Sequence, residues 1–360
     1  MTDKRTRVVV LYGGRSAEHD VSCVTAVHVL KALDPDRYDV VPIGISQDGR
    51  WLLDEATLAA LKGGARELPG ALEAAGREVS PFSQVVEAAE ADAPVVVLPL
   101  LHGPFGEDGT VQGLLEMAGV PYVGAGVLGS ALGMDKAKAK EVLGARGLPQ
   151  PRWLGVHEDE AGPALRERVH RDLGWPVFVK PANLGSSVGV SKAGDDEALE
   201  RALDLAFSYD EWVVVEEAVT GREIEVAVLG NRDPEASVPG EIVPSHEFYD
   251  YEDKYLIDGA RLVVPAPLSS EATAEVRGLA IDVFSAMRAE GMARVDFFFE
   301  EAGRGFLVNE INTIPGFTPI SMYPKLWEAS GLPYPKLVDR LIELAVERHA
   351  RRANRVGRKR

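Results

Sequence analysis

The sequence of 360 residues has one cysteine, Cys23, and no apolar run that approaches the roughly 18 residues of a membrane-spanning helix. A single cysteine excludes an intramolecular disulfide and a metal site made of several cysteines. The net charge of −17 argues against nucleic acid as a partner, because its phosphates require a basic protein surface. The N-terminus passes from charged residues directly into a strand pattern and lacks a signal-peptide pattern, so we expect a cytoplasmic protein.

The chain is 46% hydrophobic and 26% charged, which is enough to bury a large core in two or three domains. The first domain is expected at residues 1–128. Strand patterns there alternate with helix patterns: strands at 8–11, 40–45, 95–101 and 121–123, and helices at 21–33 and 109–118. This alternation predicts an α/β fold with a parallel sheet and ligands at the carboxyl ends of its strands.

Two further units are expected at residues 129–222 and 223–350. The first of them has a helix pattern at 135–146, strands at 176–180 and 211–216, and a helix at 197–206. The second has strands at 223–229, 293–299 and 305–310, helices at 270–290 and after 334, and a polar loop around 245–262. Residues 351–360 are basic without apolar periodicity, and we expect them to form a frayed, solvated tail.

Lys180 ends an apolar strand and is followed by the loop GSSVG at 185–189. A cation on a rigid strand, followed by mobile backbone N–H groups, suits a phosphate ligand. The loop is not a Walker A motif, because the lysine precedes the glycines. Most glycine- and serine-rich loops are linkers, so this pattern by itself leaves both explanations open.

Three glutamates flank the next strand pair, where Glu216 and Glu217 end one strand and Glu223 opens another. At the mouth of an apolar crevice, such carboxylates would accept hydrogen bonds from a ribose or from the amino group of a base. Charged strand ends in solvent are the more common explanation for any one of them.

The strands ARVDFFF at 293–299 and GFLVNEIN at 305–312 each place two polar side chains at positions i and i+2. Side chains alternate along a strand, so Arg294 and Asp296 share one face, and Glu310 and Asn312 share another. If the strands are neighbours, these residues form an all-oxygen ligand set of the kind that Mg²⁺ prefers. No histidine or cysteine is near, which argues against zinc. A solvated strand end is the usual explanation for an isolated E-x-N.

Together these patterns predict a phosphoryl-transfer site, with the lysine and glycine loop on one lobe and the carboxylates on the other. Protein kinases are excluded, because their glycine-rich and catalytic-loop signatures are missing. The chain resembles the D-alanine–D-alanine ligase family of ATP-grasp enzymes. The resemblance spans residues 8 to about 345 and is carried in order by GGRSAEHDVS at 13–22, LHGPFGEDGTVQGLLE at 101–116, PYVGAGVLGSALGMDK at 121–136, VKPANLGSSVGVSK at 179–192, FYDYEDKY at 248–255, ARVDFF at 293–298 and NEINTIPGFTPISMYP at 309–324.

The resemblance implies a three-domain ATP-grasp fold: an N-terminal parallel-sheet α/β domain, a central α+β lobe and a C-terminal α+β lobe. It implies an enzyme that joins two D-alanines with ATP, through a D-alanyl phosphate, for peptidoglycan precursor synthesis. Two Mg²⁺ ions are implied, with Mn²⁺ as a substitute, K⁺ as an activator and a homodimer as the assembly. No membrane or nucleic-acid partner is expected.

The resemblance also implies roles for individual residues. Nucleotide binding falls to Lys136, Lys180, Ser186, Ser187, Val188, Glu216, Glu217, Val219, Glu223 and Lys254, with Glu216 at the adenine amino group and Glu223 at the ribose. Position 217 is acidic where some relatives have lysine. The metal ligands are Asp296, Glu310 and Asn312. By the same resemblance, Glu18 binds the ammonium of the first substrate, and Tyr255 and Ser186 complete a hydrogen-bonded set with it. Arg294 and the Gly316 N–H stabilise the oxyanion. Ser321 and the Met322 backbone bind the carboxylate of the second substrate. His102 lies near the same pocket by resemblance, or is simply a buried structural histidine.

Three alternatives compete with this interpretation. A relative that makes D-alanyl-D-lactate usually has a histidine where this chain has Tyr255. A dinucleotide-binding oxidoreductase domain at residues 1–130 would need G-x-G-x-x-G, whereas this sequence has G-G-x-S after its first strand. A catalytically inactive nucleotide-binding regulator would lose Asp296 or Glu310, and both are present.

Overall fold

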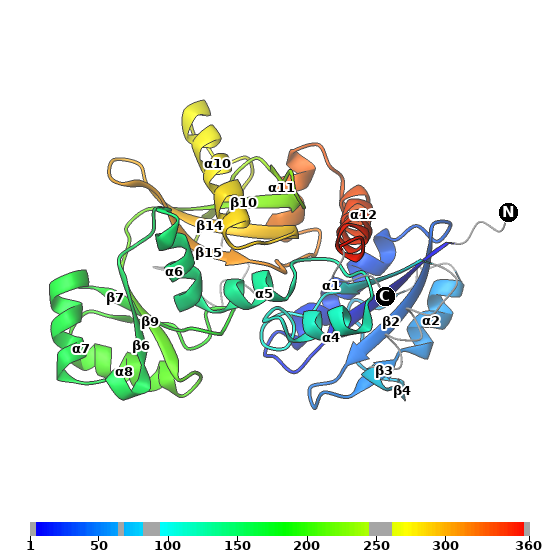
Figure 1. The fold of residues 1–360 in the computed structure, drawn as a ribbon, viewed down its shortest axis with the longest axis horizontal. Helices are drawn as coiled ribbons and strands as arrows, with labels where there is room; N and C mark the ends of the chain where they lie inside the picture. The colour runs from blue at the N-terminus through cyan, green and yellow to red at the C-terminus, as the bar shows by residue number, and fades with distance from the viewer. Residues whose placement is uncertain (1–4, 64–67, 82–93, 245–260, 356–360) are drawn as a thin grey trace.

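The computed structural model describes residues 5–63, 68–81, 94–244 and 261–355 of the chain (Figure 1). Three β-sheets follow one another along the chain, each with its own helices. None of the helices in these ranges has the length and apolar character needed to cross a membrane.

The N-terminal sheet has the strand order β4-β3-β2-β1-β5. Its three long strands are parallel, which confirms the predicted parallel sheet: β1 (Thr6–Gly13), β2 (Tyr38–Ile45) and β5 (Val95–Pro99). Two short antiparallel strands that the sequence did not predict extend one edge: β3 (Trp51–Leu53) and β4 (Arg77–Glu78). The strand predicted at 121–123 is reduced to an isolated bridge between Tyr122 and Val97. The helices of this unit are α1 (His19–Ala32), α2 (Glu55–Lys62) and α4 (Thr110–Ala118).

The central sheet is antiparallel, with the order β6-β9-β7-β8. Its strands are β6 (Trp153–His157), β7 (Val177–Pro181), β8 (Ser191–Ala193) and β9 (Trp212–Glu217). Its helices are α7 (Pro163–Arg168) and α8 (Asp196–Phe207), with short turns η1 (Glu158–Glu160) and η2 (Val169–Leu173). Two helices lead into it from the N-terminal unit: α5 (Val127–Met134) and α6 (Lys136–Ala145).

The C-terminal sheet has the order β13-β12-β10-β14-β15, with β11 beside β10. Its strands are β10 (Arg222–Gly230), β11 (Glu235–Ala236), β12 (Gly240–Val243), β13 (Arg261–Val263), β14 (Gly291–Glu300) and β15 (Gly305–Asn312). Helix α10 (Ser270–Ala286) packs on this sheet and ends four residues before the predicted end, because Arg288 adopts a left-handed backbone conformation. Two further helices follow: α11 (Met322–Ala329) and α12 (Tyr334–Ala353).

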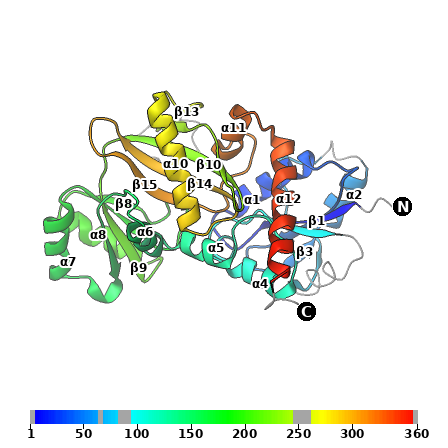
Figure 2. The ribbon, with the colours of Figure 1, turned by 45° about the horizontal axis from the view of Figure 1, so that its top comes forward.

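The hydrophobic cores show which units of the molecule pack against one another. One core contains N-terminal strand residues such as Val8 and Val10 together with Leu337 and Leu341 of α12. The central sheet instead has a core of its own, formed within residues 156–215. Figures 1 and 2 agree with this division, because α12 lies beside the N-terminal sheet while the central sheet stands apart on the far side. The N- and C-terminal units therefore share a core that the central lobe does not join.

The C-terminal end of α12 differs from the prediction. The helix continues to Ala353, and the arginines at 351 and 352 both form ion pairs with Glu290. Arg352 also bonds to Glu116. The expectation of a frayed tail is therefore wrong for residues 351–353, because these arginines find acidic partners on other elements. The exact domain boundaries at 128, 222 and 350 stay predictions.

Candidate active site

Strands β14 and β15 bring four of the predicted site residues together. They are antiparallel neighbours, with Arg294 opposite Asn312 and Asp296 opposite Glu310. The guanidinium of Arg294 donates two hydrogen bonds of 2.7 Å to the two oxygens of Asp296. The side-chain amide of Asn312 donates to the same carboxylate at 2.9 Å. The alternation read from the sequence therefore placed these side chains on one shared face.

A β-bulge adds a residue that the sequence analysis missed. Asp296 pairs with Glu310, but the next residue, Phe297, pairs with Val308, so Asn309 is left as the extra residue. Its side-chain oxygen accepts a hydrogen bond from Lys180 Nζ at 3.3 Å. The bulge thus turns two consecutive polar residues of β15 toward the site. The only sequence signal was the pair Asn309-Glu310 directly after an apolar run.

Arg294 carries a permanent positive charge in this face. Burial by itself would lower the pKa of its guanidinium, but Asp296 and Glu225 raise that pKa well above its ordinary value. The Glu225 carboxylate lies 3.1 Å from Arg294 Nε. Because the cation is held by two carboxylates on its own sheet, it is preorganised to stabilise negative charge that develops beside it.

The central lobe contributes a buried cluster of two lysines and one glutamate. Lys180 on β7 donates to Glu216 Oε2 at 2.6 Å, and Lys140 on α6 forms an ion pair with Glu216 Oε1. Burial by itself would raise the pKa of Glu216, but Lys140 and Lys180 lower it below its ordinary value. Glu216 is therefore ionised although it is almost completely buried. The sequence analysis predicted Lys180 and Glu216 as site residues and missed Lys140.

Lys136 joins this cluster to the carboxylate face. It begins α6, where Asp135 caps the helix by accepting from the Lys138 N–H at 2.9 Å. Its ammonium donates to the Leu184 carbonyl at 2.5 Å and lies 3.7 Å from Glu310 Oε2. Lys136 therefore lies between the glycine-rich loop and the strand that carries Glu310, as a phosphate-binding lysine would.

The glycine-rich loop is held in an unusual backbone conformation. Ser186 and Ser187 both have positive φ, at 52° and 59°. A left-handed conformation costs a non-glycine residue roughly 1–2 kcal/mol, and turns of this kind can point successive N–H groups at an anion. The Ser186 hydroxyl donates to Glu18 Oε1, which ties the loop to the N-terminal unit. Val188 closes the turn, where its N–H donates to the Gly185 carbonyl at 3.2 Å.

The residues predicted around the adenosine are arranged unequally. The Glu217 carboxylate accepts 2.8 Å hydrogen bonds from the Arg152 backbone N–H and side-chain Nε, and a 2.5 Å bond from Arg304. Its carboxylate is thus committed to two arginines, and a nucleotide contact by Glu217 stays a prediction. Val219 is half-buried in the connection between β9 and β10, and Glu223 lies on β10 opposite Phe298.

The N-terminal unit supplies Glu18 and His102. Glu18 occupies the N-cap position of α1. His102 is buried, its Nδ1 lies 3.1 Å from the Ile314 carbonyl, and its Nε2 has no partner among the described residues. Burial lowers the pKa of His102 although Glu18 opposes this shift, so the ring is neutral. Nearby, Glu107 accepts from the Gly103 N–H at 2.7 Å. Burial and the Glu18 charge raise the pKa of Glu107 to about 8.

The turn after β15 contains the last predicted residues. Ser321 precedes α11, and its hydroxyl lies 2.8 Å from the Thr318 hydroxyl. A Cβ atom at Gly316 would lie 3.2 Å from Ser321 Oγ, so any side chain there would be crowded. Lys254 and Tyr255, which the sequence analysis also placed in the site, lie outside the described residues.

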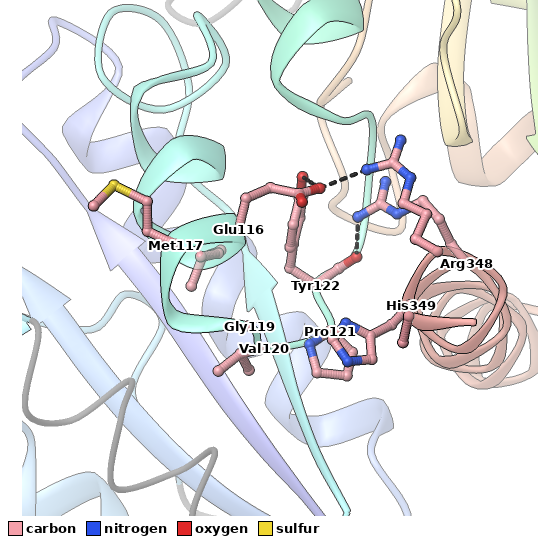
Figure 3. Close-up of a pocket in the computed structure, with 11 residues that line it drawn as sticks. Glu116, Met117, Gly119, Val120, Pro121, Tyr122, Arg348 and His349 are labelled. Atoms are coloured by element: carbon pink, nitrogen blue, oxygen red, sulfur yellow. Dashed lines mark hydrogen bonds and ion pairs between the residues drawn. The ribbon is translucent and has the colours of Figure 1, made fainter. Parts of the chain in front are cut away.

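A pocket of about 640 Å³ lies away from this site, and none of the predicted site residues lines it. It is formed by α4, residues 119–122 and α12 (Figure 3). Arg352 bonds to Glu116, and Arg348 donates to the Tyr122 carbonyl at 2.7 Å. These bonds fasten α12 to the N-terminal unit beside the pocket.

The donor set of the carboxylate face fits magnesium. Among the described residues, no group of three or more histidine, cysteine, aspartate or glutamate side chains is arranged for a metal. Asp296 and Glu310 instead carry carboxylates at directly paired positions, with the amide of Asn312 beside them. Asp296 accepts two hydrogen bonds from Arg294 and one from Asn312, and a carboxylate with about four lone-pair sites keeps one for a metal. Mg²⁺ is typically bound through one or two carboxylates together with substrate phosphates, which matches this set.

Three successive sheets, with a lysine strand and glycine loop facing a carboxylate-bearing strand pair, define an ATP-grasp enzyme. The family described as "D-ala D-ala ligase N-terminus" matches residues 7–125, and the one described as "D-ala D-ala ligase C-terminus" matches residues 142–343. The chain belongs to the D-alanine–D-alanine ligase family.

Curated relatives and solved structures support this assignment along the whole chain. A D-alanine–D-alanine ligase of Solibacter usitatus is 50% identical, with 96% of this chain and 97% of the relative covered. One from Geobacillus kaustophilus is 45% identical, with 96% of each chain covered. The D-alanine–D-alanine ligase structure from Coxiella burnetii superimposes with a TM-score of 0.80 at 39% identity, covering 97% of each chain. The VanG D-Ala:D-Ser ligase structure from Enterococcus faecalis gives 0.81 at 33% identity, covering 95% of this chain and 100% of that one.

The predicted fold and enzyme class are thus confirmed: the chain is an ATP-dependent ligase of the ATP-grasp fold, in a family that makes D-alanyl-D-alanine for peptidoglycan synthesis. The oxidoreductase alternative for residues 1–130 is excluded, because the ligase N-terminal family covers that region.

Proposed function

We propose that this enzyme joins two D-alanines at the face formed by β14 and β15, with ATP between that face and the central lobe. The observation that carries this proposal is the pairing of Asp296 with Glu310 on adjacent strands, with Lys136 3.7 Å from Glu310 and Lys180 bonded to the neighbouring Asn309. Three cations, counting Arg294, surround two carboxylates there. Such an arrangement suits a triphosphate whose terminal group must be transferred.

The first step is attack by the carboxylate of one D-alanine on the γ-phosphate of ATP, which gives D-alanyl phosphate and ADP. Lys136 and Lys180 bind the phosphates, and Glu18 binds the ammonium of this first D-alanine. Two Mg²⁺ ions held by Asp296, Glu310 and Asn312 would offset the phosphate charge. Mn²⁺ would serve in their place, and K⁺ would act as an activator.

The second step is attack by the amine of another D-alanine on the acyl phosphate. The tetrahedral oxyanion that forms is stabilised by the Arg294 guanidinium and the Gly316 N–H. Ser321 and the backbone N–H of Met322 hold the carboxylate of the incoming D-alanine at the start of α11. The attacking nitrogen loses a proton to the leaving phosphate, the C–O bond to phosphate breaks as the oxyanion collapses, and the products are inorganic phosphate and D-alanyl-D-alanine.

D-Alanine is the second substrate that we propose, because the relatives that are 45–50% identical carry that name. The test is purified protein with ATP, Mg²⁺ and D-alanine, following ADP and dipeptide, with D-serine and D-lactate assayed in parallel. We expect that ADP release requires D-alanine and that one dipeptide forms for each ADP released. ADP release that does not depend on D-alanine would refute the ligase assignment. A clear preference for D-serine or D-lactate would refute only the proposal that D-alanine is the second substrate.

We also propose a cytoplasmic homodimer. Several apolar side chains are exposed around α4 and α5, among them Met117 at 79%, Phe105, Val127 and Leu128. Apolar patches of this kind mark protein interfaces, and a second copy of the chain would cover them. Light scattering should give twice the monomer mass of 38.8 kDa, and Met117→Glu should shift it toward the monomer. A wild-type protein that is monomeric at micromolar concentration would refute this assembly.

A further inference from the structure

Helix α6 carries three lysines, at 136, 138 and 140, in very different surroundings. Positions four apart lie on the same side of a helix, so Lys136 and Lys140 share a side and Lys138 points elsewhere. Lys138 is exposed and pairs with Glu141 on its own helix at 2.9 Å. Lys140 is only 3% exposed, and its ammonium ends at Glu216 Oε1 on β9. The roles proposed above do not use this lysine.

Lys140 and Lys180 share the carboxylate of Glu216 as their ion-pair partner, and Glu310 adds its negative charge from farther away. Burial still lowers the pKa of Lys140, although Glu216 opposes this shift, so the ion pair does not fully offset the cost of burying this lysine. A buried charge without a full partner is costly, and an anion that enters the site would remove that cost. The two lysines are not equivalent, however. The Lys180 side chain is 15% exposed and the Lys140 side chain 3%, so Lys180 lies at the opening and Lys140 behind it.

We propose that Lys140 is a positioning residue for nucleotide recognition: it holds the Glu216 carboxylate in place and ionised when Lys180 turns from Glu216 to a phosphate of the nucleotide. This inference rests on the proposed function, which places ATP against Lys180 and Glu216. With Lys140 behind it, Glu216 keeps one cationic partner throughout and can accept a hydrogen bond from the nucleotide base.

As a consequence, Glu216 would select one nucleotide base over another. An ionised carboxylate only accepts hydrogen bonds, so it favours a purine with an amino group at C6 and repels one with a carbonyl oxygen there. ATP and ITP differ at this position. Without Lys140, Glu216 would keep Lys180 as its only ion-pair partner among the residues that the structure describes. That lysine could then not leave for the phosphate without stranding a buried carboxylate.

If Lys140 only stabilised the fold, a different result would be expected. The ion pair joins α6 to β9, so its loss could weaken the packing of the central lobe without affecting the choice of nucleotide. Lys140→Met is suited to separate the two roles, because it leaves Glu216 and Lys180 as a balanced pair. We therefore expect this variant to fold.

The experiment compares wild type, Lys140→Met and the control Lys138→Met, which removes an exposed lysine from the same helix. The kcat and KM for ATP and for ITP are measured at saturating D-alanine, together with the KM for D-alanine and the melting temperature. For Lys140→Met we expect the KM for ATP to rise and the preference for ATP over ITP in kcat/KM to fall, each by about tenfold or more, the lower end of the loss expected for a hydrogen bond to a charged group. Lys138→Met should match wild type, and the KM for D-alanine should change little in either variant.

An unchanged ratio of ATP to ITP in folded Lys140→Met would overturn the inference, whatever happens to the melting temperature. If Lys140→Met does not fold, Glu216→Gln and the double variant replace it. Once Glu216 carries no charge, the further change at Lys140 should leave the ATP to ITP ratio unaltered, and a further loss would count against the proposal. Wild-type protein without D-alanine-dependent ADP release refutes the proposed function instead, so the two failures are distinguishable.

Discussion

The hydrogen bond between Ser186 and Glu18 holds the glycine-rich loop, residues 185–189, against the N-terminal unit, and we expect turnover to depend on it. It joins residues 168 positions apart, one in the glycine-rich loop of the central lobe and one at the start of α1. Ser186→Ala removes only the hydroxyl. Because Ser186 has a φ of 52°, alanine retains the strained backbone that serine already accepts, whereas glycine would relieve it. Alanine therefore isolates the hydrogen bond from the conformation of the loop.

The size of the effect follows from the charge of the acceptor. A hydrogen bond to a charged group contributes about 1.5–3 kcal/mol, and a neutral one about 0.5–1.5 kcal/mol. Ser186→Ala should therefore lower kcat/KM for D-alanine roughly 10- to 150-fold, because the loop would lose its bond to the N-terminal unit. Glu18→Gln keeps an acceptor for the Ser186 hydroxyl but loses the charge, so weakening this hydrogen bond should cost about 1 kcal/mol. Any loss of ammonium binding adds to that.

The assay is ADP release at saturating ATP over a range of D-alanine concentrations, for both single variants and the double variant. Residues in direct contact should show a coupling energy of about 1 kcal/mol or more in this double-mutant cycle. Ser208→Ala is the matched control, since among the described residues the Ser208 hydroxyl bonds only to the Leu205 carbonyl, one turn earlier at the end of α8. A coupling energy below about 0.5 kcal/mol would refute the reasoning, because the two side chains would then act independently.

Three further predictions concern single residues. Glu310→Gln should keep the melting temperature and lose nearly all turnover, because Mg²⁺ prefers carboxylate oxygens; full activity at high Mg²⁺ would contradict the metal role. Burial raises the pKa of Cys23 to about 12, so its thiol should resist thiol reagents at about pH 8 until the protein unfolds, and rapid reaction of the native protein would count against this burial. Glu107 has its pKa raised to about 8, against about 4.3 in an unfolded chain, so the folded state binds the extra proton between these pH values and stability falls as pH rises through this window. The stability of Glu107→Gln relative to wild type should therefore increase as pH rises to about 8 and stay constant above it. A difference in melting temperature between the two proteins that does not change with pH would show that Glu107 ionises normally.

The local patterns of the sequence were sufficient where local geometry decides the outcome. Strand alternation has a fixed period of two, so Arg294 and Asp296 had to share a face, as did Glu310 and Asn312. The bulge lies at Asn309, before this second pair, and leaves its alternation intact. The run of apolar residues before Lys180 placed that lysine on a strand in the same way. The long helices and parallel strands were predicted to within a few residues for the same reason, because their apolar periodicity is strong.

Tertiary structure alone decided the features that depend on distant partners. The sequence shows Glu217 as one of three similar glutamates, but its carboxylate is taken by Arg152 and Arg304, which are 65 and 87 positions away. Arg351 and Arg352 look like the beginning of a solvated tail until Glu290 and Glu116 are brought beside them.

The three lysines of KAKAK, at 136 to 140, show the same limit most clearly. Helical spacing predicts that the first and the last lie on one side of α6, and it says nothing of what they will meet. Lys140 became buried because the fold placed Glu216 of β9 against it, 76 positions along the chain. Burial of a charge is stable only with a partner, and the partner comes from the packing of separate elements, which no window of local sequence contains.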